Sequence, residues 1–279
     1  MRRGISLTLL SMLLLTGCSG ENDEAAAEVP EHGGNLRAES SEAQGTEETE
    51  GTGEAEAPAD GEVAGQDQVG GPERLITAAT AGAQRAASFG FDELGFVSDD
   101  VAQSYRELLE ENSLAGEDPE VDVSPASCAA PLAAVDFSPL LLGPDAVRAD
   151  FFAQSFSGAG SIELATLDGS PDAQRVTAHR ENVRELLDSC AETEFTLDGV
   201  AYELEITEPE LDSAGDETVA YSWERSGEGT TFAQILFTQV EQDIIMVSFT
   251  GDEAVATAEF TSIAEAIAAE AAAALTETE

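Results

Sequence analysis

The chain contains no lysine, so its eleven positive charges are all arginines, and they face 57 acidic residues. Without lysine, a P-loop, a Ser-x-x-Lys site and a Schiff base are impossible. The net charge of −46 argues against a nucleic-acid partner, because phosphates need cationic side chains, and against lying flat on an anionic membrane. The acidity has two open explanations. Adaptation to salt is favoured by the spread of acids along the chain, and binding of cations or cationic partners is the alternative.

Histidine is also scarce, and this limits the catalytic options. The sequence has only His32 and His179, and it contains neither a Gly-x-Ser-x-Gly elbow nor a His-Glu-x-x-His motif. His179 is the one histidine that could serve a Ser–His–Asp site in a folded domain. An ordinary surface or half-buried histidine is the favoured interpretation, and a cell-envelope hydrolase around His179 remains the alternative. We expect no enzyme activity, no cofactor and no metal.

Of the three cysteines, the first belongs to an N-terminal export signal. Arg2 and Arg3 precede an apolar stretch over residues 7–15, which is too short to span a bilayer. Leu15-Thr16-Gly17-Cys18 then reads as a bacterial lipobox. The sequence therefore predicts a signal peptide over residues 1–17, acylation of Cys18, and a lipid-anchored protein on the extracytoplasmic face of the cell membrane.

The other two cysteines, Cys128 and Cys190, are an even pair in an oxidising compartment, so a disulfide is expected. The closed loop of about 60 residues would stabilise the fold by roughly 4 kcal/mol on the chain-entropy model. A metal site is the less favoured alternative, because only His32 and His179 could join the cysteines.

Large apolar residues are nearly absent between the lipobox and residue 72. The stretch 39–67 is mostly Glu, Ala, Gly, Thr, Ser and Gln, which cannot bury enough surface to offset the entropy of ordering. Residues 18–72 are predicted to be an acidic tether, with a root-mean-square span of about 40 Å if it behaves as a flexible coil. Residues 73–279 are predicted to form a single domain.

Within that domain, apolar periodicity predicts helices and strands in a definite order. Helices are expected over 74–88, 99–114, 124–135, 171–190 and 252–275, and strands over 147–153, 161–167, 200–206, 218–224, 230–238 and 243–250. Consecutive strands on short turns imply antiparallel pairing. The last two strands are apolar on both faces and are expected to be central. The predicted fold is α+β, a two-layer sandwich with an antiparallel sheet of five to six strands and helices packed on one face.

Aromatic and acidic residues in these strands offer two further candidate sites. Tyr202, Tyr221 and Trp223 could line a ligand cleft, although side chains at strand spacing are more often core. The segment 212–217 could offer oxygen ligands to calcium, but it lacks the alternating spacing of a calcium loop, so a solvated hairpin is favoured.

Three short motifs carry a family resemblance over about residues 90–275. They are Ser124-Pro125-Ala126-Ser127-Cys128, Cys190 at the end of the following helix, and Gly215-Asp216-Glu217-Thr218-Val219-Ala220. Together they resemble actinobacterial sensor-domain lipoproteins, which are similar to the extracellular domain of the kinase PknH. Such domains carry two disulfides, whereas this chain has cysteines for one. The resemblance implies an antiparallel sheet with helices and a ligand cleft, and it supplies no catalytic residues.

These expectations combine into one functional hypothesis. The chain is predicted to be a membrane-anchored binding or sensing module without catalysis, held by its N-terminal lipid. Its partner is expected to be an unknown envelope ligand or protein, and not nucleic acid. A classical solute-binding lipoprotein is disfavoured, because such proteins need two α/β lobes with parallel strands.

Overall fold

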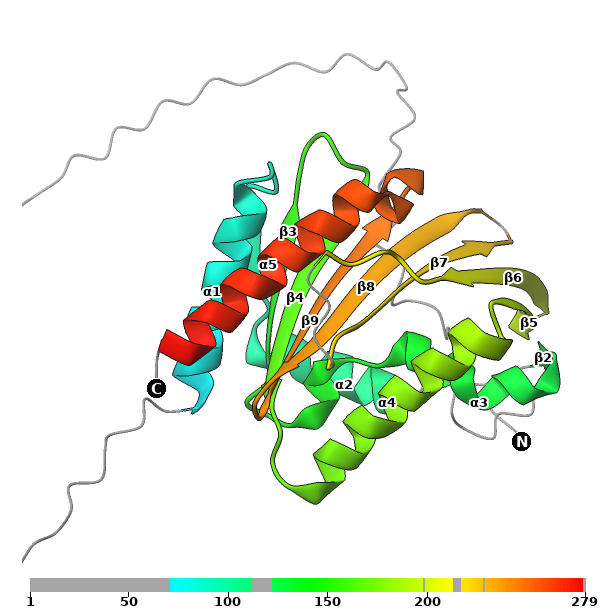
Figure 1. Ribbon diagram of the computed structural model, residues 1–279, viewed down its shortest axis with the longest axis horizontal. Coiled ribbons are helices and arrows are strands. Elements are labelled where there is room, and N and C mark those ends of the chain that lie inside the picture. Colours follow the sequence, from blue (N-terminus) through cyan, green and yellow to red (C-terminus); the bar gives the residue numbers. More distant parts are fainter. Residues whose placement is uncertain (1–70, 112–121, 198, 213–216, 228, 278–279) are drawn as a thin grey trace, which may run out of the picture. The chain divides into compact units, whose positions relative to one another are not determined.

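The computed structural model describes residues 71–111, 122–197, 199–212, 217–227 and 229–277 (Figure 1). The predicted signal peptide, Cys18 and nearly all of the predicted tether lie outside these residues, as do four residues of the segment 212–217. None of the helices within the described ranges is long and apolar enough to cross a membrane.

One antiparallel sheet organises the described residues. It has nine strands in the order β1-β3-β4-β9-β8-β7-β6-β5-β2. The strands are β1 (Glu93–Phe96), β2 (Asp122–Ser124), β3 (Val147–Phe152), β4 (Gly158–Thr166), β5 (Glu192–Leu197), β6 (Val200–Thr207), β7 (Val219–Ser226), β8 (Thr231–Val240) and β9 (Asp243–Gly251). The longer helices are α1 (Gly71–Ala87), α2 (Asp99–Glu111), α4 (Ser170–Ser189) and α5 (Ala258–Glu277). Short helical turns are η2 (Ala126–Cys128), α3 (Ala129–Leu132), η3 (Ala133–Asp136), η4 (Pro139–Leu142) and η5 (Glu253–Ala256).

Helices cover both faces of this sheet, so the expectation of a two-layer sandwich with helices on one face is wrong. Along β9, Ile245 and Val247 join a core cluster with residues of α1 and α5. We call the side of the sheet that α1 and α5 cover the first face. Ile244 and Met246, which alternate with them, join a second cluster with α4 and the turns at 126–142, on the second face. The prediction that the last two strands are central is confirmed, because β8 and β9 are buried between the two layers.

The count of five to six strands is also wrong, because β1, β2 and β5 were missed. Strands β1 and β2 have four and three residues and lie at the two ends of the strand order. Strand β5 has the sequence Glu-Thr-Glu-Phe-Thr-Leu, and glutamate is depleted in strands. The antiparallel α+β class is retained.

Helix α1 is well packed, although its sequence offers few large anchors. Its buried residues include Leu75, Ala78 and Ala83, and the helix lies against α5, which also presents buried alanines. A Cβ on Gly82 would lie 2.5 Å from the end of the Ile162 side chain, so a larger residue there would have to displace Ile162. Small residues therefore create this layer by letting two helices approach each other and the sheet.

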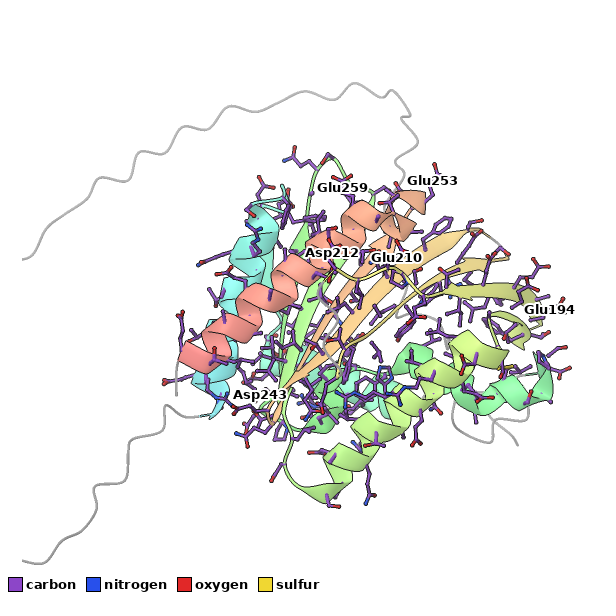
Figure 2. All side chains as sticks on the ribbon, viewed as in Figure 1. Glu194, Glu210, Asp212, Asp243, Glu253 and Glu259 are labelled. Carbon is purple, nitrogen blue, oxygen red and sulfur yellow. A yellow bond between two sulfur atoms is a disulfide. The ribbon has the colours of Figure 1, made fainter. Side chains whose placement is uncertain are left out.

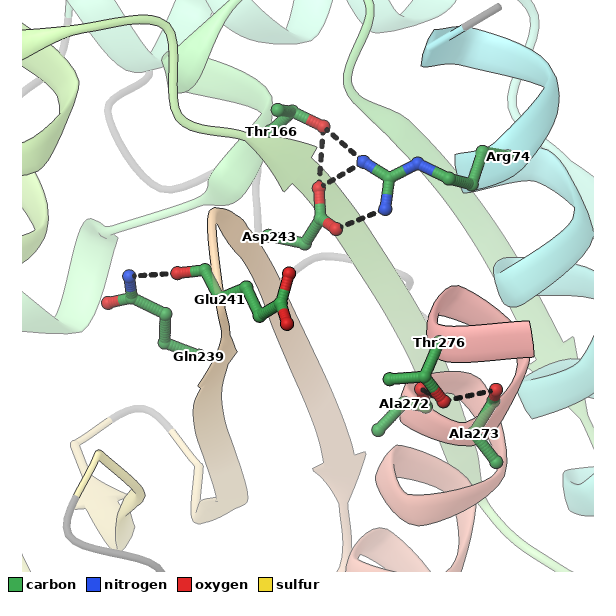
Figure 3. Close-up of polar contacts among 8 residues, drawn as sticks. All are labelled: Arg74, Thr166, Gln239, Glu241, Asp243, Ala272, Ala273 and Thr276. Atoms are coloured by element: carbon green, nitrogen blue, oxygen red, sulfur yellow. Dashed lines mark hydrogen bonds and ion pairs between the residues drawn. The ribbon is translucent and has the colours of Figure 1, made fainter. Parts of the chain in front are cut away.

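Arg74, in the first turn of α1, fastens the helix to the sheet (Figure 3). Its guanidinium donates to both carboxylate oxygens of Asp243 at the start of β9, at 2.5 and 2.9 Å. Thr166 Oγ1, at the end of β4, donates to the same carboxylate at 2.6 Å. Because Asp243 is buried and the arginine is bidentate, the contact is geometrically specific.

Candidate functional site

Cys128 and Cys190 are joined, where the sequence reasoning placed a disulfide. The sulfur atoms are 2.06 Å apart and the Cα atoms 5.7 Å apart, within the usual range for a disulfide. The bond links η2 to the residue that ends α4, and both cysteines are buried. It therefore holds the helical layer of the second face to the segment 126–142.

The three aromatic residues proposed for a ligand cleft lie on the second face. Tyr221 and Trp223 are 1% and 5% exposed in its core, and the Tyr221 hydroxyl donates to the Ala134 carbonyl at 3.1 Å. Tyr202 is half-buried and stacks on Phe195 with ring centroids 5.3 Å apart. Tyr221 and Trp223 thus take the core position that strand spacing favoured, and the ligand cleft stays a prediction.

His179 lies on the buried side of α4, where aromatic rings enclose its side chain. Its ring stacks on Phe137 at 4.1 Å between centroids and meets Phe237 edge-on at 5.0 Å. Within the part of the chain that the structure describes, neither ring nitrogen has a hydrogen-bond partner. Burial, and then the charge of Arg180, lower the pKa of His179 from 6.5 to about 3. A base that activates a nucleophile needs a hydrogen-bonded hydroxyl or thiol, and this imidazole has none among those residues.

A groove lies on the first face where α1 and α5 do not reach. Helix α5 packs over β8 and β9 and runs alongside α1, away from β6, β5 and β2 (Figure 1). The groove has a volume of about 510 Å³. We call it the acidic groove, and its lining residues are Ser124, Glu192, Thr193, Glu194, Glu203, Leu204, Glu205, Glu224 and Ser226. No arginine is among them.

Strand register brings three of these glutamates into a line, which we call the glutamate row. Glu205 on β6 lies directly opposite Glu192 on β5 and directly opposite Glu224 on β7. A second pair of like charges lies two residues along the same strands, where Glu194 of β5 (Figure 2) directly faces Glu203 of β6. Like charges directly opposite on adjacent strands are destabilising by up to about 1 kcal/mol per pair. The row therefore raises the energy of the folded state.

Sequence reasoning identified only part of this surface. A strand was expected over 200–206, where Glu203 and Glu205 alternate with apolar residues and so share one face. Strand β5 was not recognised, so the pairing with Glu192 and Glu194 was missed. The signal was the alternation Glu192-Thr193-Glu194-Phe195, which places both acids on one face. Across the described ranges, no three His, Cys, Asp or Glu side chains come together in a way that could hold a metal ion.

A buried ion pair joins β3 and β4 on the second face, and its arginine also contacts α2. Arg148 donates to Glu163 at 2.7 Å and to Asp150 at 2.7 Å, and Ser138 Oγ donates to the second Glu163 oxygen at 2.5 Å. Burial raises the pKa of Glu163, and the Arg148 charge opposes that shift. Arg148 also donates to the Tyr105 hydroxyl of α2 at 3.1 Å, and burial raises the pKa of Tyr105 to about 12.

Comparisons with known proteins find similar solved structures, including two of mycobacterial proteins, but no family. No family model matches the chain, and no curated protein matches it. The extracellular domain of PknH from Mycobacterium tuberculosis aligns at 12% identity and a TM-score of 0.38, covering 56% of this chain and 78% of that domain. An uncharacterised Mycobacterium smegmatis protein, an Rv0999 ortholog, aligns at 16% identity and a TM-score of 0.41, covering 72% of this chain and 98% of that protein. At these values neither likeness carries an argument about this chain.

Proposed function

We propose that this chain is an extracytoplasmic lipoprotein, held by acylated Cys18, whose folded domain binds a basic segment of an envelope protein without catalysing a reaction. The acidic groove is the contact surface. The anchor rests on the lipobox, and the described residues contribute no evidence to it. The hydrolase alternative has no specific observation in its favour, because His179 is enclosed by aromatic rings.

The observation that supports this proposal is the glutamate row at the open face of the sheet. A cationic chain laid across β5, β6 and β7 would neutralise Glu192, Glu205 and Glu224 together, and so relieve their mutual repulsion. The groove is open, and its acids are spread over neighbouring strands. Among the described residues, no three of them lie close enough together to hold a metal ion. An extended arginine- or lysine-rich segment fits this shape better than a compact ion.

The test compares groove acids with acids elsewhere on the same chain. A labelled oligo-arginine peptide is titrated into the mature chain and followed by fluorescence anisotropy. The groove variant replaces the glutamate row by glutamine at all three positions. The control variant is Glu241→Gln with Glu253→Gln and Glu270→Gln, three exposed acids that do not line the groove. Both variants lose the same charge.

We expect the groove variant to weaken binding at least tenfold and the control variant to change it by less than about twofold, because a contact surface is local and the net charge is not. Equal weakening by the two variants would mean diffuse attraction to a salt-adapted surface. That result would remove the groove from the proposal and leave salt adaptation as the explanation of the acidity.

A further inference from the structure

A second hollow lies where α1, β1, α2 and β3 meet, and its chemistry differs from that of the groove. Its volume is about 160 Å³, roughly the size of a cavity that accepts one benzene ring. Its apolar wall includes Ile76 of α1, Phe96 of β1, Ala102 of α2 and Val147 of β3, and Arg106 of α2 also lines it. We call it the Arg106 pocket.

Arg106 presents a buried donor that nothing satisfies. Its Nη1 atom is shielded from solvent and has no hydrogen-bond partner among the described residues. Neighbouring Arg148 lines the same pocket, but its charge is already matched by Glu163 and Asp150. Asp99 also lines the pocket, yet it forms no ion pair with Arg106 within the described ranges. Arg106 therefore lines the pocket as a partly exposed cation without an ion-pair partner among the described residues, and this charge favours an incoming anion.

The mouth of this pocket is apolar and exposed. Ile76 and Phe96, which line it, are 44% and 50% exposed, and Leu94 on the same face of β1 is 46% exposed. The chain has a net charge of −46, yet two large exposed hydrophobic side chains and an arginine line this one pocket. Grouped exposed apolar residues mark binding sites more often than isolated ones do.

We propose that the Arg106 pocket binds a small organic acid, with the carboxylate paired to the accessible part of the Arg106 guanidinium and an apolar ring or short chain against Ile76 and Phe96. The volume excludes a long acyl chain. The apolar wall disfavours a bare inorganic anion, which would lose its hydration without compensating contacts. This site is independent of the acidic groove, and it takes a ligand of the opposite charge.

The test uses benzoate as the probe and saturation-transfer NMR on the mature chain as the readout. Benzyl alcohol and sulfate serve as partial probes, because the first lacks the charge and the second lacks the ring. We expect benzoate to bind saturably and to bind at least tenfold more tightly than either, since a hydrogen bond to a charged partner adds at least that much. Equal binding of benzoate and benzyl alcohol, or no saturable binding of benzoate, overturns the proposal.

Two variants and one salt series test whether benzoate binds at Arg106. Arg106→Gln should weaken benzoate binding at least tenfold, whereas Arg184→Gln, which removes an exposed arginine of α4, should leave it unchanged. Raising salt from about 50 to about 300 mM should not weaken benzoate binding, because screening relieves the repulsion between the acidic chain and the anion. An unaffected Arg106→Gln variant places the acid elsewhere. If that variant fails to fold, the comparison of benzoate with benzyl alcohol on the native chain still decides the proposal.

Discussion

Lowering the pH should destabilise the domain through His179. The folded environment holds the pKa of this imidazole at about 3, against 6.5 when it is solvated. The neutral form is therefore the one that folds, and the histidine's contribution is fully present above about pH 6.5 and is lost as the pH falls towards 3. At about pH 5, roughly 1.5 pKa units below the unfolded value, the loss is about 2 kcal/mol.

The assay is urea unfolding of the mature chain at about pH 7.5 and about pH 5. The acid groups also titrate, so the informative quantity is the pH effect in the native chain minus that in His179→Phe, which keeps a ring between Phe137 and Phe237 but cannot be protonated. We expect this difference to be about 2 kcal/mol. His32→Gln, which removes the other histidine, should behave as the native chain does. If His179→Phe shows the full native pH dependence, the imidazole is not protected by burial and the reasoning fails.

Three further predictions concern the cysteines and the glutamate row. Mass spectrometry without reduction should show Cys128 joined to Cys190, and replacing both by alanine should cost roughly 4 kcal/mol of unfolding free energy on the chain-entropy model; free thiols in the native chain would contradict the pairing. Cys18→Ser should release the protein from membranes in a fractionation experiment, and continued retention would argue against the lipid anchor. Neutralising the glutamate row to glutamine should raise unfolding free energy by about 0.5–2 kcal/mol at low salt, an effect that shrinks at high salt; a destabilised variant would mean that the row is not repulsive.

The sequence predicted those strands whose burial shows as a local apolar pattern. All six expected strands exist: β6 alternates apolar and acidic residues, whereas β8 and β9 are apolar on both faces. The terminal strands β1 and β2 were not predictable in this way. They are too short for a pattern, and each exists only because it pairs with a strand far along the chain.

The layer arrangement was misjudged although its signal was present. A strand that is apolar on both faces needs a cover on both faces, and β8 and β9 were recognised as such strands. This requirement contradicts a two-layer sandwich. The close packing of α1 against α5 was not predictable for a related reason, since alanines signal close packing only when their partner helix is known.

The two hollows differ in how far sequence could reveal them. The acidic groove follows from strand alternation once β5 is recognised. The Arg106 pocket combines Ile76, Phe96, Arg106 and Val147, which come from four separate elements. No local pattern joins these positions, because only the folded topology brings them together.

The attachment of Arg74 to Asp243 has a mechanical consequence. Helix α1 begins at Gly71, close to where the predicted tether ends, so tension from a lipid-held N-terminus would enter the domain through the first turn of α1. There the guanidinium is bound at two points to a buried carboxylate on a central strand. A pull on the tether would thus load the Arg74–Asp243 contact, and through it the first residue of a central strand.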